Sequence, residues 1–171
     1  MSSSKSLKQR MADEKGAELV EFAFLLPLLL VIVAGTWDFG RAYRVNQAIT
    51  NAAREGARLA VVPAGLNQTA AVQNRVLDYL AKSNVDTSTI AANKNRYIKV
   101  QNPSNDPLNT TVTVNLSGGG TTRVTVSRVT VDYPFSFILF GPVMKLLVPG
   151  STTSGAMLLH TTVTMENQPP V

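Results

Sequence analysis

The strongest constraint on this chain is an apolar run near its N-terminus. Residues 22–37 carry no charge, and apolar character extends back to Ala17 with two glutamates between. As a helix rising about 1.5 Å per residue, residues 17–39 span roughly 34 Å, and the hydrocarbon layer of a bilayer is about 30 Å thick. The sequence therefore predicts a transmembrane helix over residues 17–39.

The charges on either side of this run predict its orientation. Four of the chain's 16 lysines and arginines precede it: Lys5, Lys8, Arg10 and Lys15. They outnumber Arg41 and Arg44, which follow it. Because positive flanks favour the cytoplasm, we expect a single-pass protein with its N-terminus inside and residues 66–171 outside the cytoplasm.

Two other interpretations of the run stay open. A buried core helix can be equally apolar, although it needs a core on all sides. A conventional signal peptide, cut near residue 35, would instead release a secreted binding module. Against the signal peptide, Glu18 and Glu21 interrupt the start of the run, and the helical pattern continues past the cut.

Composition argues against most catalytic chemistry. The chain has no cysteine and one histidine, His160, so we expect no metal site, no cofactor and no enzyme activity. We interpret His160 as an ordinary histidine of a strand. The net charge of +5 comes from scattered cations with little aromatic interleaving, which predicts no nucleic-acid partner. No motif indicates a small-molecule substrate.

A short motif lies at the cytoplasmic rim of the run, where Gly16 and Ala17 are followed by Glu21 and Phe22. We expect Gly16 to offer a protease an extended backbone before the helix begins. A cut after Gly16 would leave an α-ammonium on Ala17 at the edge of the lipid, where an unpaired charge is costly. Glu21, four residues on, can neutralise it within its own helix or on a neighbouring chain. The alternative is a glutamate that only reaches toward the headgroups.

This arrangement resembles the processing site of prepilins and pseudopilins. The resemblance implies that a prepilin peptidase removes residues 1–16 as a leader and that the mature chain begins at Ala17. A longer pattern is similar to the TadE-like minor pilins of the tight-adherence (Flp) pilus machinery. It comprises GAELVEFAFLLPLLL at 16–30, WDFGRAY at 37–43 and QAITNAAREGAR at 47–58. The resemblance implies a structural subunit of the bacterial inner membrane that joins other pilin or pseudopilin subunits in a pilus.

Residues 40–62 predict an amphipathic extension of the same helix. Small residues recur at Ala48, Ala52, Gly56 and Ala60, a stripe that permits close backbone approach. Polar residues occupy another face: Arg44, Gln47, Asn51, Arg54 and Arg58. The stripe packs either on the chain's own C-terminal domain or on another pilus subunit, or on both along different arcs.

The remaining chain, residues 66–171, predicts a small α+β domain of the pilin-like type, with a short helix and an antiparallel sheet. Residues 68–82 have helical periodicity and residues 83–95 form a polar linker. Alternating apolar residues predict strands over 96–101, 109–116, 121–131 and 155–165. A phase slip at Ser127 and Arg128 predicts a β-bulge, and residues 117–120 predict a hairpin turn.

Residues 133–148 are almost as apolar as the first run. Gly141 and Pro142 divide them, so a second membrane span is not favoured. We expect a segment or short helix that covers the core. An exposed patch for subunit docking or for contact with the membrane surface is the alternative.

Overall fold

The structure is a computed structural model that forms two compact units. Unit 1 comprises Met1–Gly40 and Phe137–Gly155, and unit 2 comprises Arg41–Ser136 and Ala156–Val171. The residues described are 7–62, 68–106, 110–115, 118–148 and 156–167. A single helix, α1 (Leu7–Ala60), contributes to both units. The α+β fold predicted from the sequence is confirmed.

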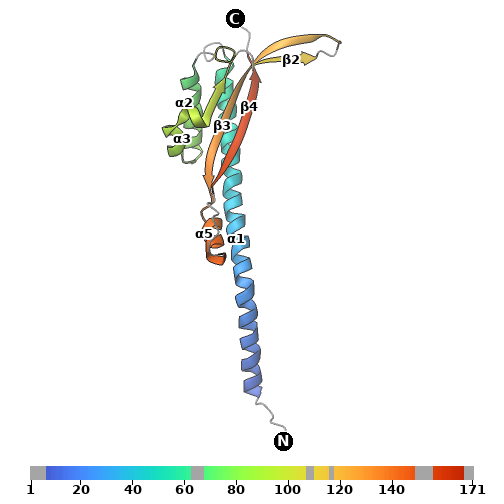
Figure 1. Ribbon diagram of the computed structural model, residues 1–171, viewed down its shortest axis with the longest axis vertical. Helices are drawn as coiled ribbons and strands as arrows, with labels where there is room; N and C mark the ends of the chain where they lie inside the picture. Colours follow the sequence, from blue (N-terminus) through green and yellow to red (C-terminus); the bar gives the residue numbers. More distant parts are fainter. Residues whose placement is uncertain (1–6, 63–67, 107–109, 116–117, 149–155, 168–171) are drawn as a thin grey trace. The chain divides into compact units, whose positions relative to one another are not determined.

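The described residues of unit 1 form two helices. The N-terminal part of α1 is one, and the short helix α5 (Phe140–Leu147) is the other. Figure 1 shows α5 beside α1, and a Cβ placed on Gly35 of α1 would lie 3.9 Å from the Phe140 ring. The short helix expected within residues 133–148 is therefore confirmed, but Tyr133 to Ser136 before it belong to a strand.

Unit 2 packs the C-terminal part of α1 and three short helices on a sheet. The helices are α2 (Thr69–Lys82), α3 (Ser88–Ala92) and α4 (Lys94–Tyr97). The strands are β1 (Ile98–Gln101), β2 (Thr111–Asn115), β3 (Thr121–Ser136) and β4 (Ala156–Glu166). The helix predicted at 68–82 and the strand predicted at 155–165 are confirmed to within a residue.

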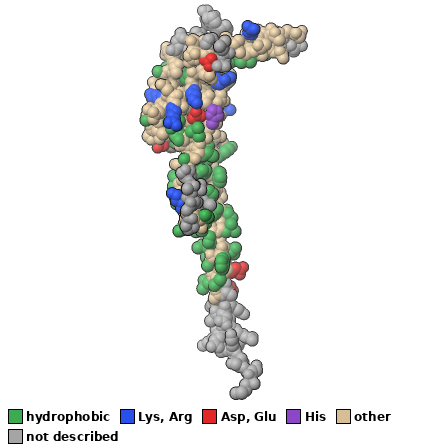
Figure 2. Space-filling view, in the orientation of Figure 1, with side chains coloured by type: hydrophobic (Ala, Val, Ile, Leu, Met, Phe, Trp, Pro, Cys, Tyr) green, Lys and Arg blue, Asp and Glu red, His purple; other side chains and the backbone are tan. Residues whose placement is uncertain are grey.

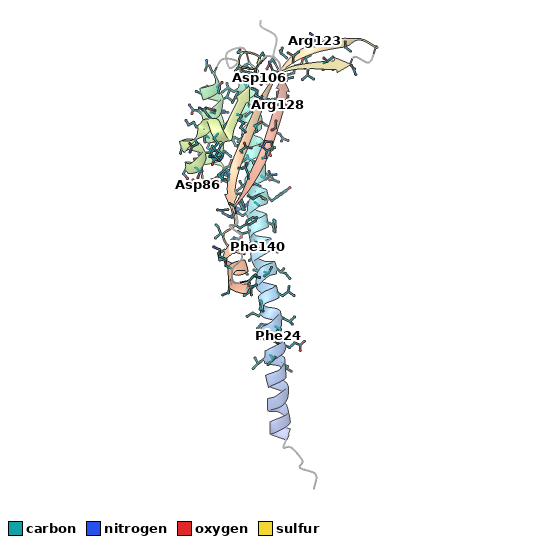
Figure 3. All side chains as sticks on the ribbon, viewed as in Figure 1. Phe24, Asp86, Asp106, Arg123, Arg128 and Phe140 are labelled. Carbon is teal, nitrogen blue, oxygen red and sulfur yellow. The ribbon has the colours of Figure 1, made fainter. Side chains whose placement is uncertain are left out.

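Strand β3 is the centre of the sheet, and its three neighbours are all antiparallel to it. It pairs with β2 from Thr121 to Thr125, with β4 from Val126 onward, and with β1 over residues 128–131. The hairpin of β2 and early β3, where Arg123 is labelled, extends away from the rest of the unit (Figures 1 and 3). All five residues of β2 are exposed.

The predicted bulge at Ser127 and Arg128 is wrong. Both residues pair one to one with β4, opposite Met165 and Thr164. The apolar residues change face because β3 leaves the exposed hairpin with β2 and enters the sheet against α1. There Val129 and Val131 are fully buried.

The polar linker predicted at 83–95 is also wrong, since α3 and the start of α4 lie within it. Two contacts hold α3. Ile90 is fully buried in the core, and the Asp86 carboxylate accepts a hydrogen bond of 2.9 Å from the Ser88 amide. That bond lowers the pKa of Asp86, because it favours the ionised form.

Candidate functional site

The N-terminal part of α1 exposes a continuous apolar surface. It is the one helix among the described residues that is long and apolar enough to cross a membrane, and only 11% of its most apolar window is buried. Most of the large side chains along it are exposed, among them Phe24, which is 80% exposed. Figure 2 shows hydrophobic side chains covering this part of the helix. A core helix would be mostly buried, so the core-helix interpretation is not supported.

The four residues of the predicted processing site lie on α1 near the start of this surface. Gly16, Glu21 and Phe22 are exposed, whereas the side chain of Ala17 lies outside the described ones. Ala17 and Glu21 are one helical turn apart. The expected extended backbone before the helix is not found, because α1 already begins at Leu7 and includes Gly16.

The small-residue stripe of α1 is buried within the chain's own unit 2. Ala52 and Ala60 have no exposed surface, Gly56 is buried and Ala48 is half-buried. Of these, Ala52 and Ala60 belong to the hydrophobic core, together with side chains of α2 and β3. The polar residues predicted on the other face are all exposed, namely Arg44, Gln47, Asn51, Arg54 and Arg58.

Gly56 marks the closest approach in this packing. A Cβ at this position would lie 2.6 Å from Cγ2 of Val76 in α2 and 3.5 Å from Cγ1 of Val129 in β3. Real Cβ atoms do not come as near as 2.6 Å to another carbon, so a hydrogen at this position is what lets α1 meet both elements.

Asp38 is a fully buried charged residue of unit 1, and its role was not predicted from the sequence. Its carboxylate is fully buried and accepts backbone hydrogen bonds from Ile138 at 3.2 Å, Leu139 at 2.8 Å and Phe140 at 2.7 Å. These amides lie at the start of α5 and just before it. Asp38 of α1 therefore acts as the N-terminal cap of a helix about 100 residues further along the chain. A carboxylate also suits the positive end of the helix dipole.

The sequence around α5 explains why the cap comes from elsewhere. Leu139, just before the helix, has no side-chain acceptor, and Pro142 in the first turn has no N–H to satisfy. The only signal in the sequence is an aspartate placed directly after the apolar run. Nothing near it in the chain indicates its partner.

A cavity of about 360 Å³ lies in unit 2 beside Tyr133. It is lined on one side by Arg41 and Arg44 of α1 and on the other by Asn84 and Asp86. Burial raises the pKa of the Tyr133 phenol, the Asp86 carboxylate raises it further, and Arg41 lowers it. The tyrosine therefore stays protonated and neutral here well above physiological pH.

His160 lies on β4, in a strand as predicted, and contacts a nearly buried carboxylate. Its Nδ1 is 2.6 Å from Oδ1 of Asp132 on β3, and Nζ of Lys99 on β1 is 3.4 Å from Oδ2. The carboxylate thus links three neighbouring strands through charge-assisted bonds. Among the described residues, no group of three His, Cys, Asp or Glu side chains is placed to hold a metal ion.

A long helix with an exposed apolar N-terminal part, continued into a helix that packs on a small antiparallel sheet, is the plan of pilin-like proteins. Residues 16–58 match the sequence model of a family described as TadE-like protein. The resemblance predicted from the sequence is confirmed over that segment, and it supports a pilin-like component associated with the tight-adherence pilus. No significant match to the chain was found among curated proteins or among solved structures.

Proposed function

We propose that this chain is a minor pilin or pseudopilin of a tight-adherence pilus. In this proposal a prepilin peptidase cuts it after Gly16, and its helix anchors it in the bacterial inner membrane with the N-terminus inside. The chain then joins other pilin subunits through helix packing and performs no catalysis. The observation that carries the proposal is the contrast along α1: its N-terminal part is apolar and exposed, while its C-terminal part is buried in unit 2.

Such a helix suits a subunit that leaves the membrane for a fibre. Apolar side chains that face lipid before assembly can face the helices of other subunits afterwards, so one surface serves both states. The matched segment, residues 16–58, covers this surface and part of the helix that packs on unit 2.

Processing predicts a defined mature N-terminus. We expect mass spectrometry of the protein from its native membrane to find a chain that begins at Ala17. Gly16→Leu should block the cut and leave the full-length chain. Nothing lies within 4 Å of a Cβ at Gly16, so the substitution gives the fold no reason to change. A mature chain that begins near Thr36 would instead establish a signal peptide and a secreted protein, against the proposal.

Glu21→Gln tests the electrostatic part of the proposal. It removes the charge that would neutralise the Ala17 ammonium and keeps the size of the side chain. We expect normal cutting but at least tenfold less of the variant in sheared pili, since a lost interaction of about 1.4 kcal/mol changes an equilibrium tenfold. The measurement is the ratio of variant to parent in pili, divided by the same ratio in membranes.

Glu18→Gln is the matched control for this experiment. Glu18 is also exposed on α1, three residues earlier, but is not four residues from Ala17. We expect it to enter pili as the parent does. Equal incorporation of Glu21→Gln and the parent would remove the role proposed for Glu21.

A further inference from the structure

The outer end of the apolar part of α1 has its hydroxyl and its charged side chain hydrogen-bonded inside the protein. Between residues 22 and 40 the one hydroxyl belongs to Thr36 and the one charge to Asp38. Thr36 Oγ1 donates to the carbonyl of Ile32 at 2.8 Å, and Asp38 accepts three amide bonds while fully buried. In lipid, polar groups need such partners inside the protein, because no water is present to replace them.

The capped aspartate also changes the length of the apolar segment. The uncharged run ends at Trp37, before Asp38, and is about 16 residues long, shorter than the roughly 20 that a bilayer needs. With the Asp38 carboxylate shielded beneath α5, the surface free of exposed charge extends to Gly40. That gives roughly 28 Å of helix, close to the thickness of the hydrocarbon layer.

The exposed surface of α5 is largely apolar. The exposed large apolar side chains of α5 and its flanks are Ile138, Leu139, Leu146, Leu147 and Val148, and Leu146 is 75% exposed. The one charge in the helix is Lys145, in its last turn, and a lysine can extend its ammonium from an apolar layer to the phosphates. At the opening of the helix, the amides of residues 138–140 donate to Asp38 and so are not left without a partner.

We infer that α5 and the residues just before it lie in the outer leaflet of the membrane, beside the spanning helix, with lipid acyl chains as their partner. The inference rests on the proposed function for the presence and orientation of the spanning helix. It adds a second contact with the membrane, formed by a helix of the C-terminal half of the chain. Aromatic side chains at the same end of α1, Trp37 and Phe39, are 66% and 60% exposed, as expected of a belt at the lipid boundary.

Spin labels can measure this placement, because the chain has no cysteine of its own. The full-length chain would carry one cysteine in each of three variants and be reconstituted in phosphatidylcholine vesicles with one-fifth phosphatidylglycerol. Leu146→Cys probes α5, Val33→Cys the spanning helix and Val112→Cys the exposed hairpin. Collisions of each label with oxygen and with a water-soluble nickel chelate are measured by power saturation, since oxygen concentrates in lipid and the chelate in water.

We expect the label at residue 146 to behave like the label at residue 33, with frequent oxygen collisions and few nickel collisions. The label at residue 112 should show the reverse. A label at 146 that meets nickel as often as the label at 112 would overturn the inference, because α5 would then face water. A label at 146 that is shielded from both reagents would also overturn it and indicate a second copy of the chain as the partner. If the label at 33 itself met nickel freely, the spanning helix and hence the proposed function would fail.

Discussion

Replacing Gly56 by alanine is expected to destabilise unit 2 by about 1–3 kcal/mol, the usual cost of overpacking a filled core. Helix propensity alone predicts the opposite sign, since alanine in a helix interior is better than glycine by roughly 1 kcal/mol. Packing should win because the new Cβ would lie 2.6 Å from Val76 Cγ2. Val76 is fully buried, and a valine in a helix has one strongly preferred rotamer, so it cannot turn away.

The measurement is the midpoint of unfolding of the full chain in detergent, followed by the near-ultraviolet circular dichroism of its tyrosines. Gly40→Ala is the matched control, because Gly40 lies in the same helix and a Cβ there meets nothing within 4 Å. We expect that control to raise stability by up to about 1 kcal/mol.

A second substitution tests the cause of the effect. Val76→Ala alone should destabilise the protein by leaving a cavity, but combined with Gly56→Ala it should recover part of the loss, since the new methyl group fills space that the valine vacates. A Gly56→Ala variant at least as stable as the parent would contradict the close packing of α1 on α2 and β3.

The burial of the small-residue stripe of α1 limits which surfaces of the subunit can contact other subunits. The stripe packs within the chain. The surface of α1 that unit 2 leaves exposed to other subunits is therefore the polar face, with Arg44, Asn51 and Arg58. Contacts made there would be polar and sensitive to salt. The apolar contacts that we propose for the pilus therefore belong to the part of α1 before Gly40.

Periodicity was enough to predict the long elements. A period near 3.6 places the helices at 40–62 and 68–82, and a period of two places β1, β2 and β4. These patterns arise because each element buries one face, which a single sequence records directly. The resemblance over residues 16–58 could be recognised for a similar reason, since the apolar run, Gly16 and Glu21 lie close together in the sequence.

The errors fall where a distant partner decides the structure. Nothing near α3 shows that Ile90 is buried in the core. Pro134 argues against a strand interior, yet β3 continues through it. Strand β1 pairs with β3 only as far as Val131, so at Pro134 one side of β3 is free of β1 and the missing N–H is tolerated.

The clearest case of a distant partner is Asp38, and it leads to the second large effect. Asp38→Ala removes the carboxylate that accepts the amide bonds of residues 138–140 at the start of α5, and hydrogen bonds to a charged group contribute about 1.5–3 kcal/mol each. We expect α5 to separate from α1 far more often. The amides of Leu139 and Phe140 should exchange with solvent deuterium at least about 100-fold faster, since each tenfold corresponds to roughly 1.4 kcal/mol of opening free energy.

Hydrogen exchange of the full chain in detergent, read by mass spectrometry on peptides that cover residues 137–147, measures this change. Thr36→Ala is the matched control: it removes a polar group from the same stretch of α1, but one that bonds only to Ile32 of its own helix. We expect it to leave exchange in α5 unchanged. Asp38→Asn should fall between the two, because its oxygen can keep the two shorter bonds while its amide nitrogen faces the Ile138 donor. Unchanged exchange in Asp38→Ala would mean that contacts of the apolar side chains alone hold α5 on α1, and that the buried carboxylate is tolerated there without being needed.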